Sequence, residues 1–152
     1  MLLKLAGAIG AAGILLTTLS AAPASATTNT ITIGPVTLTD RVLVTVPVTV
    51  VCDPLGTVTD QFQNSLSVSV TQASGQAVAT GSLDILTVSP QLIFTCDGVT
   101  QNHVVADVFP AAGSPPFHGG PAIISASFGV FDFATQTGEG GSTGNLSVTI
   151  HA

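Results

Sequence analysis

The chain has no tryptophan and no tyrosine, and charged side chains make up only 7% of its 152 residues. Its basic side chains are Lys4 and Arg41, against eight acids. Nucleic-acid binding depends on lysine and arginine to neutralise phosphates, and anionic membranes attract the same residues. We therefore expect neither nucleic acid nor an anionic membrane as a partner. The lack of Trp and Tyr also removes the usual sugar platforms, which argues against a glycoside hydrolase that uses paired carboxylates.

The first 26 residues have the pattern of a secretory signal peptide. Lys4 gives a positive start, residues 5–19 are uncharged and apolar, and Ala24-Ser25-Ala26 offers small residues for cleavage. A retained membrane helix needs about 20 predominantly apolar residues, and this run is shorter and rich in glycine. We therefore predict a secreted protein whose residues 27–152 form a single domain. Because Lys4 leaves with the signal, that domain has a formal charge of −7.

Apolar and polar residues alternate with period two through most of the remaining chain. The alternation is clearest in residues 65–72, where Leu66, Val68 and Val70 face inward and Ser and Thr face outward. The other expected strands are residues 28–33, 42–52, 76–80, 83–88, 91–96, 103–109, 122–133 and 145–151. Gly, Pro and Asp at the breaks favour turns. Seven to nine short strands predict an all-β fold, an antiparallel immunoglobulin-like Greek-key β-sandwich.

The two cysteines, Cys52 and Cys96, predict one intramolecular disulfide in an exported protein. Each ends an apolar strand face, so both point towards the core. A catalytic thiol needs a nearby base, and neither cysteine has a histidine near it in sequence. An intermolecular bridge is the other alternative. The spacing of 44 residues is short for an immunoglobulin bridge, and no Trp packs on it, so the pattern favours a sandwich that is not an antibody-type domain.

Two patterns resemble reactive sites without completing them. Residues 140–144 match G-x-S-x-G around Ser142, but a nucleophile elbow needs a helix after the serine, and a strand is expected there. We interpret this segment as a flexible glycine loop. His103, His118 and His151 lack the spacing of a zinc site. We therefore predict no catalytic residue, no metal and no cofactor.

Three aspartates leave one metal question open. Asp53, Asp60 and Asp97 can meet around the disulfide and offer carboxylate oxygens, which calcium prefers. Aspartates that follow strands are more often turn-formers. Both interpretations stand at this point.

The segment 110–121 is long for a connection between strands and contains four prolines and three glycines. Connections of this length are usually functional or disordered, and the prolines restrict the backbone. In one interpretation Phe117 folds back and caps the end of the sandwich. In the other, Phe117 and His118 project at the loop tip and form a binding edge.

Three short sequences carry a resemblance. They are the run 67–81, Thr95-Cys96-Asp97-Gly98 and Gly120-Pro121-Ala122. Together they resemble small exported immunoglobulin-like β-proteins of actinobacteria, whose function is uncharacterised. The similarity covers roughly residues 52–128. It implies the fold and the export route and carries over no functional residue.

These observations predict an exported, non-enzymatic β-sandwich that acts as an extracellular binding or cell-envelope interaction module. The expected partner is an extracellular protein or an envelope component. One alternative is a small secreted hydrolase whose site is assembled only by folding. Another is a structural surface protein that self-associates through its nearly uncharged faces.

Overall fold

The computed structural model describes residues 29–40, 42–55, 62–88 and 94–152. Over these residues the chain is all-β and contains no helix, which confirms the predicted class. A helix long and apolar enough to cross a membrane is accordingly not found in this part of the chain. Residues 1–26 lie outside the described residues, so the signal peptide stays a prediction.

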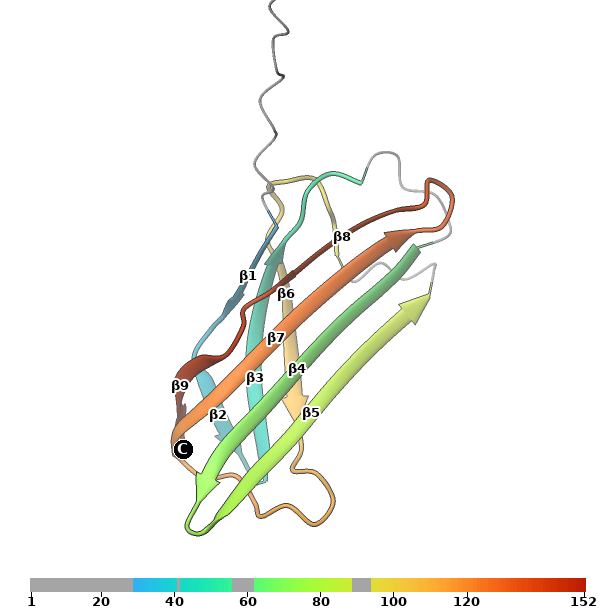
Figure 1. Cartoon of the computed structure of the whole chain (residues 1–152). Coiled ribbons are helices and arrows are strands. Elements are labelled where there is room, and N and C mark those ends of the chain that lie inside the picture. Colours follow the sequence, from blue (N-terminus) through green and yellow to red (C-terminus); the bar gives the residue numbers. More distant parts are fainter. Residues whose placement is uncertain (1–28, 41, 56–61, 89–93) are drawn as a thin grey trace, which may run out of the picture.

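The strands join into one mixed sheet that curls into a half-barrel (Figure 1). Hydrogen bonds connect them in the order β1-β3-β2-β9-β7-β4-β5, with β6 on β3 and β8 on β7. The nine strands of the described residues are β1 (Thr30–Ile33), β2 (Val36–Thr39), β3 (Leu43–Val51), β4 (Phe62–Ser74), β5 (Ala77–Val88), β6 (Asn102–Val108), β7 (Gly120–Asp132), β8 (Thr137–Ser142) and β9 (Leu146–His151).

One strand pair is parallel, so the prediction of a wholly antiparallel arrangement is wrong. β2 runs parallel to β9, with Val36 opposite Ile150. The reason lies at Gly34-Pro35, where the extended strand is interrupted between β1 and β2. Both strands pair antiparallel with β3, but Pro35 has no backbone N–H to continue the ladder. The Gly34 N–H donates a hydrogen bond to the Pro47 carbonyl at 2.8 Å, just beyond the end of the β1–β3 pairing. After Pro35, β2 pairs with β9 on its other side.

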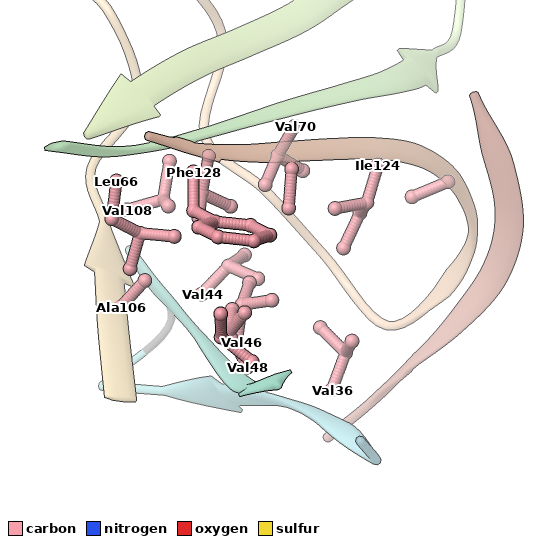
Figure 2. Packing of buried hydrophobic residues seen from close by; sticks show 14 of the residues in the cluster. Val36, Val44, Val46, Val48, Leu66, Val70, Ala106, Val108, Ile124 and Phe128 are labelled. Carbon is pink, nitrogen blue, oxygen red and sulfur yellow. The ribbon is translucent and has the colours of Figure 1, made fainter. Parts of the chain in front are cut away.

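The core lies between the two halves of the curled sheet. On β3, every second residue from Val44 to Val50 is buried, and these side chains face Leu66 and Val70 of β4 and Phe128 of β7 (Figure 2). The predicted alternation in residues 65–72 is thereby confirmed. Burial of each such apolar side chain contributes about 1.5–3 kcal/mol to folding.

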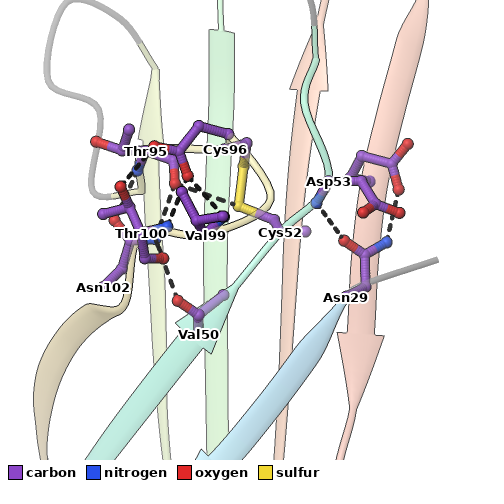
Figure 3. Close-up of a disulfide and its surroundings, with 12 residues drawn as sticks. Asn29, Val50, Cys52, Asp53, Thr95, Cys96, Val99, Thr100 and Asn102 are labelled. Carbon is purple, nitrogen blue, oxygen red and sulfur yellow. Dashed lines mark hydrogen bonds between the residues drawn. A yellow bond between two sulfur atoms is a disulfide. The ribbon is translucent and has the colours of Figure 1, made fainter.

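The predicted disulfide between Cys52 and Cys96 is present (Figure 3). It joins the end of β3 to the segment that precedes β6, across a sequence separation of 44 residues. Cys52 is fully buried. Beside the bridge, the Asn102 amide donates to the Val50 carbonyl at 3.1 Å and to the Thr95 carbonyl at 3.0 Å. The end of the core is therefore closed by a covalent bond and an amide that ties two segments together.

Three details of the strand prediction are wrong. Residues 140–144 are expected as a flexible loop, but residues 140–142 belong to β8, which pairs antiparallel with β7. The expected strands 76–80 and 83–88 are one continuous strand, β5, because its residues pair with β4 without interruption. Residues 94–96 are not a strand, and residues 91–93 lie outside the described part.

Candidate functional site

Phe117 lies in the core, with 2% of its surface exposed. Phe117 therefore does not project at a loop tip, and its burial agrees with the interpretation in which it folds back. The physical reason is that an aromatic ring gains more from burial at the open end of the core than from exposure to water. Its neighbour His118 is exposed at the surface.

Gln72 of β4 holds the loop in place from inside. Its side-chain Nε2 donates to the His118 carbonyl at 2.8 Å, and the His118 backbone N–H donates to its Oε1 at 2.9 Å. The His118 ring adds contacts outside, with Nδ1 2.8 Å from the Gly119 carbonyl oxygen and Nε2 3.1 Å from that of Ala73. Sequence reasoning missed Gln72, although an amide at an inward position of a strand was a usable signal.

The other end of the loop is bound to β5. The Ala111 backbone N–H donates to the Thr80 carbonyl at 2.7 Å, and the Thr80 N–H donates to the Ser114 hydroxyl at 2.8 Å. At the next residue, Gly81, a Cβ would overlap the carbonyl of Phe109, so only glycine allows the two segments to approach this closely. The loop is therefore anchored at both ends and forms a rigid border at this end of the sheet.

A shallow hollow of about 370 Å³ lies next to this border, on the outer face of the sheet. Val78 of β5 and Ile123 of β7 are its large apolar side chains, and they are 55% and 47% exposed. His118 lies at its edge, because the His118 ring contacts the carbonyl of Ala73. The lining residues are Thr71, Ala73, Val78, Pro121, Ala122, Ile123 and Ser147.

Sequence reasoning missed this hollow, although a signal was present. Ile123 precedes the buried Ile124, and two consecutive large apolar residues break the period-two pattern. Exposed apolar side chains that gather in a hollow indicate a contact surface more than scattered ones do. The hollow is therefore the candidate binding site, and His118 is the part of the predicted binding edge that remains at the surface beside it.

The rest of this outer face carries mostly small hydroxyl side chains in rows that cross the strands, together with Leu86 of β5, which stands opposite Ser65 and is 61% exposed. Ser69 of β4 stands opposite Ser82 of β5 and Ser125 of β7, and the Ser69 and Ser125 hydroxyls are 2.8 Å apart. Asp84 is the only charged residue among the outward positions of β4, β5 and β7 that the structure describes. We call this surface the serine face; its members are Ser65, Ser67, Ser69, Thr71, Thr80, Ser82, Ser125, Ser127 and Ser142.

Asp97 forms a turn. Its carboxylate accepts hydrogen bonds from the Val99 N–H at 2.9 Å and from the Thr100 N–H and hydroxyl, each at 2.6 Å (Figure 3). These bonds, with that from the Thr100 hydroxyl foremost, lower the pKa of Asp97 below its ordinary value of 3.8. The turn-forming interpretation therefore holds for this residue.

The remaining sequence-predicted groups do not form a site in the part of the chain that the structure describes. There, no three His, Cys, Asp or Glu side chains lie close enough to hold a metal ion. The backbone N–H of Asp53 donates to the Asn29 side chain at 2.8 Å. Asp60 lies outside the described residues, so the calcium hypothesis stays a prediction.

Ser142 ends β8 and is followed by a short connection into β9. Its hydroxyl accepts a hydrogen bond from the Gly144 N–H at 3.1 Å. The segment is therefore strand–turn–strand and not the strand–turn–helix of a nucleophile elbow.

Comparison with known proteins gives no family: no family model, curated protein or solved structure matches this chain.

Proposed function

We propose that this protein is an exported, non-enzymatic binding module of the extracellular space or cell envelope. Its partner is an extracellular protein or an envelope component, and the contact is made at the hollow between Val78 and Ile123. The observation that carries this proposal is the gathering of exposed apolar side chains beside a loop anchored by Phe117 and Gln72. Rigid scaffolds commonly present their binding surfaces in this way, because little conformational entropy is lost on contact.

The strand pairing supports an immunoglobulin-like fold as part of the same proposal. The series β1-β3-β6 corresponds to strands A, B and E of such a domain, and β9-β7-β4-β5 corresponds to G, F, C and C′. The resemblance to exported actinobacterial proteins points to the same fold.

Two observations support export. Residues 1–26 have the order of a signal peptide, and the Cys52–Cys96 disulfide is the kind of bond that persists in oxidising compartments.

A pair of matched variants tests the site. Val78→Lys places a charge in the hollow, whereas Val105→Lys places the same charge on β6, on the opposite outer face, where the valine is 61% exposed. The exported protein and both variants are immobilised and exposed to cell-envelope extract and secreted material. We expect Val78→Lys to lose the captured partner and Val105→Lys to retain it. Equal capture by all three proteins would contradict a site at the hollow.

A further inference from the structure

We infer that the serine face binds a second copy of this chain, so that the exported protein forms a face-to-face dimer. The inference rests on the proposed function, because it names the partner that the outer face of β4, β5 and β7 takes.

The size of the face agrees with a stable dimer. β4 and β7 have 13 residues each and β5 has 12. β8 and β9 pair with successive parts of β7 and together take the place of a fourth strand. Strands of this length span about 43 Å, and four strands are about 19 Å wide, which gives roughly 800 Å². A standard specific interface buries about 800 Å² per partner. The whole face therefore has the area that one partner of a standard interface buries, and a dimer that used all of it would also cover the hollow at Val78 and Ile123.

The chemistry of the face is complementary to itself. A hydroxyl group both donates and accepts hydrogen bonds, so a serine surface can satisfy a second serine surface without any charged partner. Most of these side chains are small, so two sheets can approach closely away from Leu86, Val78 and Ile123. A basic or acidic partner would find no matching charge here except Asp84.

Charge also makes this the favourable face for self-contact. Two copies that each carry a formal charge of −7 repel where their acids meet. On the opposite outer face, Asp107 lies in the open and accepts a hydrogen bond from Thr45. Asp53 and Asp97 directly follow the two disulfide cysteines, Cys52 and Cys96. On the serine face, Asp84 is the only charged side chain among the outward positions that the structure describes, so like-charge repulsion between two copies is smallest there.

The position of Asp84 selects the orientation of the dimer. A two-fold axis across the strands would stack β5 on β5 and bring both Asp84 carboxylates to the same edge. An axis along the strands, between β4 and β7, stacks β5 of one copy on β8 of the other. Ser127 lies in one cross-strand row with Ser67, Asp84 and Ser142. In this second arrangement Asp84 faces Ser142 of the second copy, and the hydroxyl can donate to the carboxylate.

Two lysine substitutions in this row give opposite predictions. Ser127 and Ser142 are cross-strand partners and both are exposed. Ser127→Lys puts a charge near the axis with no acid opposite it, so we expect dimerisation to weaken by about tenfold or more. Ser142→Lys puts the charge opposite Asp84 of the second copy, so we expect a dimer at least as tight as the wild type, and tighter at low salt.

Sedimentation equilibrium of the exported protein measures the mass over a range of concentrations and salt. Thermal unfolding of each variant checks that it is folded. A wild-type mass of one chain throughout, or equal weakening by both substitutions, would overturn the dimer. If the wild type is monomeric and Val78→Lys still loses the partner captured from the extract, the proposed function stands and this inference falls. If the protein dimerises as expected but captures nothing, the binding of another component falls and the dimer stands.

Discussion

The ring of Phe128 occupies the space where Gly141 would carry its Cβ. The two residues are cross-strand partners in β7 and β8, and a Cβ built on Gly141 would lie 2.9 Å from Cε1 of the ring. The ring cannot easily move, since Phe128 is 5% exposed and packs edge-on against Phe94 at a centroid distance of 5.8 Å. An aromatic side chain that covers a glycine on the neighbouring strand is a known way of stabilising an otherwise weak glycine-rich strand.

We expect Gly141→Ala to destabilise the protein by about 1–3 kcal/mol, because the added methyl group displaces the Phe128 ring from a packed position. Chemical denaturation followed by fluorescence of a bound dye or by circular dichroism measures this loss. Ser127→Ala, at an exposed position of β7, serves as the control and should remain close to wild-type stability. A Gly141→Ala variant as stable as that control would show that the Phe128 ring does not exclude a side chain at residue 141.

Two buried amides on β4 lead to opposite expectations. Gln72→Leu leaves the His118 N–H and carbonyl without their partners, so we expect a loss of about 1–3 kcal/mol. The Asn64 amide is also buried, but its Oδ1 and Nδ2 have no hydrogen-bond partner among the described residues. Asn64→Leu should therefore be neutral or stabilising. Equilibrium unfolding measures the free energy of unfolding of both variants. A similar loss of stability in the two would refute the role given to Gln72.

The Cys52–Cys96 disulfide should contribute much of the stability. Closing a loop with a separation of 44 residues constrains the unfolded chain by about 4 kcal/mol in the chain-entropy model. We expect the double variant Cys52→Ser, Cys96→Ser to lose an amount of this order in urea unfolding, and reduction of the wild type to have the same effect. Denatured, unreduced wild-type protein should contain no free thiol. Two thiols per chain would contradict the bridge.

The Asp97 turn predicts a measurable pH dependence. Because the pKa of Asp97 is lowered in the folded state, the carboxylate stabilises the fold above its ordinary pKa of 3.8, and this contribution is lost as the pH falls through the folded-state pKa. The foremost cause is the Thr100 hydroxyl, so Thr100→Val should raise the pKa of Asp97, whereas Thr100→Ser should leave it low. Titration of the carboxyl carbon by NMR tests this, and identical curves in both variants would count against it.

The all-β class, the inward residues of β4 and the disulfide could be predicted from local patterns, because alternation and cysteine count are properties of single segments. β8 could not, since its glycine-rich sequence shows no apolar alternation and the strand is seen only in its pairing with β7, where Phe128 covers Gly141. The parallel pairing of β2 with β9 likewise depends on how the chain bends at Gly34-Pro35. The burial of Phe117 could not be predicted, because it depends on how the loop 110–121 folds back onto the core. The hollow was missed because Val78 and Ile123 meet only after β5 and β7 have both paired with β4.

Hydroxyl-radical footprinting tests the central claim, that the outer face of β4, β5 and β7 is the binding surface. The exported protein is labelled alone at low concentration, at high concentration, and with the captured envelope or secreted material. The account predicts that Val78 and Ile123 become protected when a partner is bound, while Val105 on the opposite face remains labelled to the same extent. Protection of Val105 with continued labelling of Val78 and Ile123 would contradict it.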